Sequence, residues 1–189
     1  ATDYYLKKEQ GIFLYDQPAW IILKPGNSLG LPNAMLADQI IKQQAQTWLD
    51  VNIPEFRLRI MEGGQTRYTF PVRVGRVAKR YLATAGREVD TRTHTGEGYI
   101  FNIVTNPLYM NPVDGHVYES TLRDDKRRTK LPQIPFLHTE LNGKRWGELI
   151  HPTTNPATLG RAYSNGCIGT SEAAAWRIYY HAPIGTKIR

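Results

Sequence analysis

The chain has 189 residues and a mass of 21.5 kDa, the size of one ordinary domain whose core needs no disulfide or structural metal. Hydrophobic residues make up 41% and charged residues 22%, which is typical of globular proteins, and no apolar run approaches the roughly 18 to 20 residues of a membrane span. The formal net charge of +7 favours polyanionic partners such as nucleic acid, a membrane surface or an acidic wall polymer. The single cysteine excludes an intramolecular disulfide and a cysteine-rich metal site.

The amino terminus has no recognisable export signal. It opens with Ala1 to Tyr5 and lacks a basic start followed by an apolar run. This pattern fits either a cytoplasmic protein or a mature chain whose signal has been cleaved. The sequence at this end does not distinguish the two.

The first third of the chain contains one clear helical pattern. Apolar residues recur at intervals of three and four between Asn33 and Asp50, which predicts a helix with Asn33 as its N-cap and Pro54 as its stop. Before it, residues 11–23 are expected to form two short strands around the turn sequence Asp16 to Pro18.

From residue 55 the hydrophobic period changes to two. Apolar and polar residues alternate over 56–60 and again over 68–74, on either side of the turn sequence Glu62 to Gln65. This pattern predicts a β-hairpin, the clearest in the chain.

The remaining elements are mostly strands. Residues 98–104 and 146–150 are expected to be strands, and a helix is expected from Ser171 to about His181, with Ser171 or Thr170 as N-cap. Because strands outnumber helices and are joined by hairpins, we predict a mainly antiparallel β domain with two accessory helices.

One segment is strongly basic. Residues 123–130 hold five Lys or Arg side chains in eight positions, with two aspartates between them. A solvated loop is the favoured interpretation, and a binding site for an anionic polymer is the alternative. The run lacks the interleaved aromatic residues of a nucleic-acid stacking platform, so no nucleic-acid partner is expected.

Cys167 is either a buried structural residue or a chemical group, and its neighbours favour the second. Small and polar residues surround it, and Gly166 and Gly169 allow the backbone to turn several amide N–H groups toward one point, as an oxyanion hole requires. The helix expected just afterwards has a positive N-terminal end that favours thiolate over thiol. Both effects would make Cys167 a better nucleophile.

A nucleophilic thiol also needs a base, and His151 is the best candidate. The chain has five histidines, which are His94, His116, His138, His151 and His181. His151 stands at the end of a predicted strand and precedes a rigid loop with two prolines that can return the chain to Cys167. Spacing alone leaves a structural role for His151 equally open.

At this point four segments resemble the signature of the YkuD-type L,D-transpeptidases. His151 heads a loop that ends in the block Ser164 to Cys167, which resembles the family's Ser-His-Gly-Cys block with its nucleophile. Upstream, residues 70–75 resemble the family's Pro-Val-x-x-Gly strand, and residues 93–100 resemble its Thr-Pro-x-Gly-x-Phe segment.

The resemblance implies a fold and a division of the chain. The fold is a YkuD-like antiparallel β-sandwich or barrel with two accessory helices. Residues 1–50 are expected to be an N-terminal extension that packs on the core, and residues 51–189 an L,D-transpeptidase-like catalytic domain, together one compact unit.

The resemblance also implies a reaction. Cys167 is the nucleophile, His151 the base, and backbone amides around Asn165, Gly166 and Cys167, with Ser164 in the same block, form the oxyanion and substrate site. The thiolate attacks a peptidoglycan stem peptide, D-Ala leaves, and an amine acceptor resolves the thioester. No metal or cofactor is implied, carbapenem-type inhibitors are, and the expected location is the periplasm or cell envelope, with the signal peptide already removed.

Two positions depart from the family pattern. Asn165 stands where the family has His, and Gly169 stands where an Arg commonly follows the Cys-Ile pair. Asn can still donate a hydrogen bond, whereas the lost Arg removes a fixed cation that could orient a carboxylate. Arg161 is the candidate to supply that cation instead.

Two alternatives stay open beside the transpeptidase. An L,D-carboxypeptidase would form the same acyl-enzyme and send it to water. A non-catalytic module of the same fold would use its basic surface to hold the wall polymer.

Overall fold

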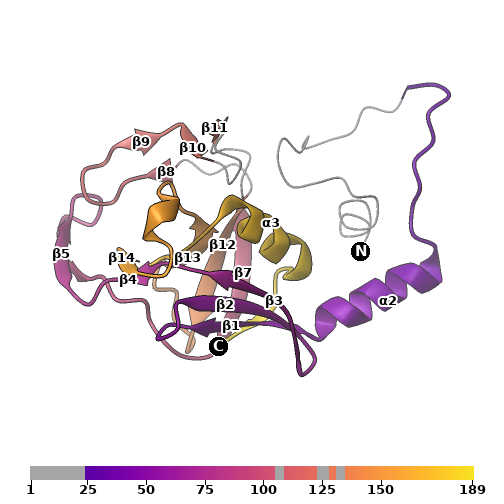
Figure 1. Cartoon of the computed structure of the whole chain (residues 1–189), viewed down its shortest axis with the longest axis horizontal. Coiled ribbons are helices and arrows are strands. Elements are labelled where there is room, and N and C mark those ends of the chain that lie inside the picture. Colours follow the sequence, from indigo (N-terminus) through magenta and orange to yellow (C-terminus); the bar gives the residue numbers. More distant parts are fainter. Residues whose placement is uncertain (1–23, 105–108, 123–127, 131–134) are drawn as a thin grey trace.

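A computed structural model describes residues 24–104, 109–122, 128–130 and 135–189 (Figure 1). The two strands predicted within residues 11–23, and residues 123–127 of the basic run, lie outside these ranges. The helices are α2 (Ala34–Ala45), α3 (Glu172–His181) and the short 3₁₀ turn η3 (Pro156–Thr158). None of the described helices is long and apolar enough to cross a membrane.

An eight-stranded sheet forms the centre of the described structure. In the order of their neighbours, its strands are β15 (Ile168–Thr170), β13 (Leu149–Pro152), β12 (Phe136–Leu141), β7 (Gly98–Val104), β16 (Lys187–Ile188), β1 (Thr47–Asn52), β2 (Arg57–Glu62) and β3 (Gln65–Pro71). The short pairs are β4 (Val74–Gly75) with β14 (Ala162–Ser164), β5 (Lys79–Leu82) with β6 (Arg87–Asp90), β8 (Tyr109–Met110) with β9 (Val117–Tyr118), and β10 (Ser120–Leu122) with β11 (Arg128–Lys130).

The sheet is mainly antiparallel, as predicted, and also contains two parallel pairs that were not expected. β13 pairs with β15 in parallel, as β1 does with β16, and the other neighbours in this sheet are antiparallel. Parallel neighbours need a crossover connection instead of a hairpin. Hairpin signals in the sequence could not reveal these two pairs, whereas the mainly β class with two helices is confirmed.

The predicted helix from Asn33 to Asp50 is right in its first part and wrong in its second. Asn33 caps α2, because its Oδ1 accepts a hydrogen bond from the Leu36 N–H at 2.8 Å. The helix ends at Ala45, well before Pro54, and Thr47 begins β1. Leu49 is fully buried in the sheet, where burial outweighs the helical spacing of the preceding residues. The sheet therefore includes the last residues of the predicted N-terminal extension.

Local signals elsewhere predict the elements well. The hairpin of β2 and β3 forms around residues 62–65, and β7 covers 98–104 as expected. Ser171 caps α3 by accepting from the Ala174 N–H at 3.2 Å. The end of the basic run, residues 128–130, is strand β11 and not part of a loop.

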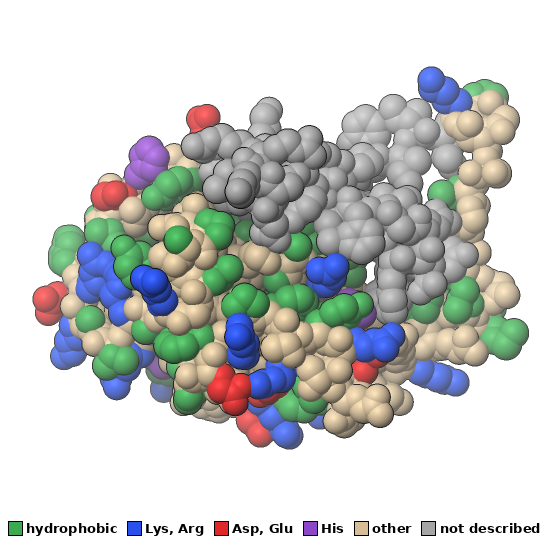
Figure 2. Space-filling view, in the orientation of Figure 1, with side chains coloured by type: hydrophobic (Ala, Val, Ile, Leu, Met, Phe, Trp, Pro, Cys, Tyr) green, Lys and Arg blue, Asp and Glu red, His purple; other side chains and the backbone are tan. Residues whose placement is uncertain are grey.

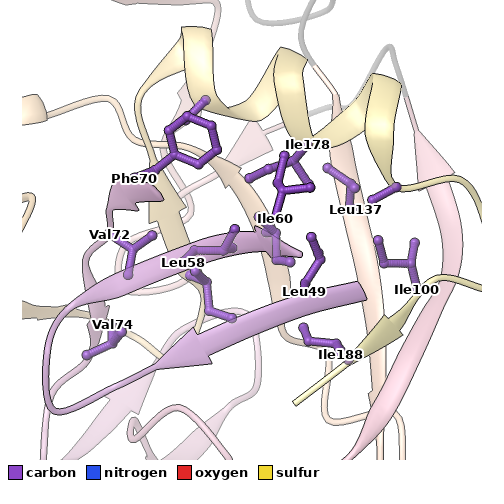
Figure 3. Packing of buried hydrophobic residues seen from close by; sticks show 14 of the residues in the cluster. Leu49, Leu58, Ile60, Phe70, Val72, Val74, Ile100, Leu137, Ile178 and Ile188 are labelled. Atoms are coloured by element: carbon purple, nitrogen blue, oxygen red, sulfur yellow. The ribbon is translucent and has the colours of Figure 1, made fainter. Parts of the chain in front are cut away.

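The main core lies between the sheet and α3, which crosses one face of the sheet (Figure 1). In Figure 3, Ile178 of α3 points toward Ile60 and Leu137 on the strands below. All three side chains are fully buried. The same core cluster includes Ile150 of β13 and Ile168 of β15, so it extends to the sheet edge that carries these strands.

A β-bridge joins the two edges of the sheet. Arg73 lies just beyond β3 and forms a bridge with Gly169 of β15, at the opposite edge. Each residue donates its backbone N–H to the carbonyl of the other at 2.9 Å. The sheet thus closes on itself at this point, as a barrel does.

Leu49→Ala should lower the free energy of unfolding by about 2–5 kcal/mol, because it leaves a cavity in the core. The matched control is Leu31→Ala, since Leu31 is 60% exposed, and it should change the free energy by less than about 0.5 kcal/mol. Urea unfolding of both variants measures the difference. Equal effects would contradict the placement of Leu49 in β1.

Candidate active site

An open groove of about 1090 Å³ lies at the β13–β15 edge of the sheet. Its lining includes Cys167 and His151 together with Ser164 and Asn165 of the intervening block. The structure therefore brings the predicted nucleophile and base to one cavity. Their roles in catalysis remain predictions.

The parallel pairing of β13 and β15 sets the relation between the two residues. His151 lies opposite Gly169 in the register, and Cys167 precedes Gly169 by two positions. Because side chains alternate along a strand with period two, Cys167 is expected to share the face of the sheet that carries His151. The presence of both residues in the groove lining agrees with this.

His151 is held in one tautomer. It is 2% exposed, its ring stacks on Phe136 at 4.8 Å between centroids, and its Nδ1 lies 2.8 Å from the Pro152 carbonyl oxygen. A carbonyl can only accept, so Nδ1–H donates and the lone pair is on Nε2. Burial, and secondly the positive charge of Arg73, lower the pKa of His151 to about 4. His151 is therefore a neutral imidazole with a basic Nε2 at neutral pH.

The half-buried thiol of Cys167 has a raised pKa, whereas the end of the following helix is expected to favour the thiolate. Burial raises its pKa to about 11, and nearby Glu148 also raises it, while a backbone hydrogen bond from Leu149 and the charge of Arg73 lower it. The helix expected to favour the thiolate begins only at Glu172, beyond β15. Desolvation thus outweighs the groups that favour the anion.

Hydrogen bonds within the chain hold the loop before Cys167. The Gly166 N–H donates to Ser164 Oγ at 3.2 Å, and Thr93 Oγ1 donates to the Gly166 carbonyl at 2.7 Å. Ser164 Oγ in turn donates to the Cys167 carbonyl at 2.6 Å. Ser164 and Gly166 therefore shape the turn, and the Gly166 amide, a predicted oxyanion donor, is directed at Ser164 Oγ. The φ of +119° at Gly166 explains why glycine is needed there.

Asn165 lies in the groove lining and is fixed by an arginine. Its Oδ1 accepts from Arg76 Nη1 at 3.3 Å, and the Arg76 guanidinium lies 4.6 Å from the centre of the Tyr163 ring. Since the side-chain oxygen is engaged, the group that Asn165 can offer a substrate is its NH₂ donor.

A buried acid that the sequence did not reveal lies behind the cysteine loop. Glu148 is 6% exposed, and its Oε1 accepts from the backbone N–H of His94 at 2.9 Å and lies 2.7 Å from His94 Nδ1. Burial raises the pKa of Glu148. His94 stacks on Trp146 at 3.8 Å between ring centroids. Trp146 lines the groove, so this cluster supports one of the groove residues from behind.

Arg161 does not occupy the position predicted for it. It is exposed and is not among the residues that line the groove. Arg73, which lines the groove and is 9% exposed, lies there instead. No local signal singles out Arg73, because only the folded sheet brings it beside β15.

A profile of the YkuD family, described as the L,D-transpeptidase catalytic domain, matches residues 46–189. The chain belongs to this family. Among curated proteins, none matches the chain significantly.

Solved structures of L,D-transpeptidases share the YkuD fold with this chain. The enzyme of Xylanimonas cellulosilytica has a TM-score of 0.54 and 14% identity, over 75% of this chain and 58% of that one. LdtMt1, solved in complex with imipenem, has a TM-score of 0.52 and 15% identity, over 76% and 58%. The enzyme of Mycobacterium smegmatis has a TM-score of 0.50 and 14% identity, over 76% and 57%. The chain therefore spans less than two thirds of each, and likeness at this identity concerns the fold alone.

His151 should make stability depend on pH. An unfolded histidine titrates near pH 6.5 and folded His151 near 4, so unfolding takes up a proton between these values. The stabilisation is present above pH 6.5 and is lost as the pH falls toward 4, where the loss is on the order of 3 kcal/mol. Urea unfolding from pH 7 to pH 4 should therefore show a shallower slope for His151→Gln than for the wild type. Exposed His116 provides the control, and a His151→Gln slope equal to that of His116→Gln would contradict the assignment.

Proposed function

We propose that this protein is a cysteine L,D-transpeptidase that joins peptidoglycan stem peptides. The observation that carries the proposal is the meeting of Cys167 and a buried, neutral His151 in one groove of a YkuD-family chain. A base with its lone pair on Nε2 and a protonated thiol are the two groups that covalent acyl transfer through cysteine requires.

The first half-reaction forms a thioester. His151 Nε2 accepts the thiol proton while the Cys167 sulfur attacks the carbonyl carbon of the L-centre of the diaminoacyl residue. The C–N bond to D-Ala then breaks, and His151 returns the proton to the departing amine. Because the pKa values of about 11 and about 4 favour the neutral pair, proton transfer accompanies the attack and does not precede it.

The second half-reaction restores the enzyme. An amine of a neighbouring stem attacks the thioester carbon and loses a proton to His151, and the sulfur leaves and takes that proton back. The Asn165 NH₂ and the backbone amide of Cys167 are the proposed donors to the oxyanion. These steps use no metal or cofactor. Within the described ranges, no three His, Cys, Asp or Glu side chains form a group that could hold a metal ion.

The charge of the protein suits this substrate, and the periplasm or cell envelope, where peptidoglycan lies, is the proposed location. The net charge is +7, and on the face shown in Figure 2 Lys and Arg side chains gather around the end that carries β5. Four arginines line the groove, which are Arg73, Arg76, Arg80 and Arg87. Stem peptides carry carboxylates, which such a surface attracts.

Cys167→Ala should abolish both the covalent adduct with a carbapenem and the turnover of a tetrapeptide stem. Imipenem is the probe, because LdtMt1 has been solved in complex with it. Intact-protein mass spectrometry measures the adduct, and thermal unfolding checks that the variant keeps its fold. Turnover retained by Cys167→Ala would refute the proposed nucleophile.

His151→Ala should slow acylation by about 10²- to 10⁴-fold, since it removes the general base. The matched control is His116→Ala, because His116 is exposed and is not among the groove residues. Stopped-flow or quenched acylation with imipenem measures both rates. Similar rates for the two variants would assign the base to another group.

The fate of the acyl group separates transfer from hydrolysis. Incubation with tetrapeptide muropeptides should give cross-linked dimers that mass spectrometry detects, together with release of D-Ala. Shortened monomers without dimers would identify the protein as an L,D-carboxypeptidase. Binding of the stem without any release of D-Ala would identify a non-catalytic wall-binding module.

A further inference from the structure

We propose that Arg73 binds the carboxylate that follows the scissile bond, which is the free C-terminus of the donor stem. This inference rests on the proposed function and adds to it a residue that selects the substrate. It makes the enzyme specific for donors that end one residue after the bond that is cut.

Arg73 is a buried cation with no anionic partner in the part of the chain that the structure describes. It is 9% exposed, and among residues 24–104, 109–122, 128–130 and 135–189 no carboxylate forms an ion pair with it. Its Nη1 reaches Thr158 Oγ1 at 3.4 Å, and its buried Nε has no hydrogen-bond partner. Burying a charge is costly unless an anion or a full set of hydrogen bonds compensates it. An anionic ligand in the groove that Arg73 lines would provide that compensation.

The strand register places Arg73 beside the predicted catalytic pair. Gly169 pairs with His151 on one side and with Arg73 on the other, so the three residues form one row across neighbouring strands. A Cβ added to Gly169 would lie 2.6 Å from Arg73 Nε and 2.7 Å from its Cγ. The arginine side chain therefore covers the face of Gly169 that a side chain would occupy, next to His151.

Electrostatics agree with this placement. The positive charge of Arg73 contributes to the lowered pKa of His151 and acts against the raised pKa of Cys167. A cation that acts on both groups lies close to the reacting atoms.

The C-terminal carboxylate is the anion of the donor that fits this place. Only one residue separates it from the carbonyl that Cys167 attacks, so it is the carboxylate held nearest to the sulfur. Of the other groove arginines, Arg76 is engaged with Asn165, and Arg80 and Arg87 belong to the separate β5–β6 pair. Those side chains suit carboxylates farther along the stem.

The same geometry accounts for Gly169. An Arg commonly stands at this position in the family, and here its space is filled by the side chain of Arg73 from the opposite sheet edge. The positive charge is thus supplied by residue 73 instead of residue 169. A residue with a Cβ at position 169 would collide with the Arg73 side chain.

The experiment compares two tetrapeptide stems, one with a free C-terminal carboxylate and one with a C-terminal amide. Calorimetry measures their binding to Cys167→Ala, which holds the peptide without cleaving it. The free acid should bind at least about tenfold more tightly than the amide, since a charge-assisted hydrogen bond is lost with the amide. Equal affinities would overturn the proposal.

Variants in the Cys167→Ala background assign the preference to a residue. Arg73→Gln should remove the preference for the acid, whereas Arg57→Gln, an exposed arginine outside the groove, should keep it. Arg161→Gln tests the competing candidate and should also keep it. A preference that survives Arg73→Gln, or that is lost with Arg161→Gln, would refute the assignment.

The double variant Arg73→Ala/Gly169→Arg places the arginine on β15 instead. If Arg73→Gln does not fold, this variant tests whether a cation at this place causes the preference for the acid. It should bind the acid more tightly than the amide, and a folded double variant without this preference would contradict the proposal. Turnover by the wild type separates the two inferences. Acid-selective binding without turnover would refute the proposed function alone, and equal turnover of acid and amide would refute the role of Arg73 alone.

Discussion

The pair of backbone hydrogen bonds between Arg73 and Gly169 is the contact on which the site depends. It joins the two edges of the eight-stranded sheet, so β15 has a neighbour on both sides instead of an open edge. One side of β15 receives His151 through β13, and the other receives Arg73. His151 and Arg73 are thus positioned by main-chain register, which is more rigid than a loop contact. The α3 helix holds the same edge from the face of the sheet through Ile178.

Burial is the second constraint, and it acts on both predicted catalytic groups in the same direction. It disfavours the imidazolium at His151 and the thiolate at Cys167, so the resting pair is neutral. An unpaired thiol that is protonated at rest reacts slowly with unrelated electrophiles. In the proposed reaction, the thiol becomes reactive only when a bound carbonyl accepts the sulfur while Nε2 accepts the proton. The structure therefore favours substrate-dependent activation over a preformed ion pair.

Local sequence patterns predicted the elements but not the contacts between them. The β2–β3 hairpin and the Ser171 cap follow from period-two alternation and capping chemistry within a few residues. The spacing of Trp48 and Leu49 continues the helical period and so predicts a helix, whereas pairing with β2 and β16 makes both residues part of a strand. The raised pKa of Cys167 and the hydrogen bond from the Gly166 amide to Ser164 could not be predicted, because desolvation and this bond are properties of the folded loop.

Under the role proposed for Arg73, the chain lacks the arginine of the motif at position 169 but keeps a positive charge beside it. A linear motif records only the position after the Cys-Ile pair, where this chain has no cation. In the sheet, however, positions 73 and 169 are direct neighbours, and a side chain from either can fill the same space beside His151. The two positions are therefore coupled by sterics as well as by charge: an arginine at one requires a small residue at the other. The effect of Gly169 therefore depends on its neighbours in the sheet, His151 and Arg73, and not only on the residues beside it in the linear sequence.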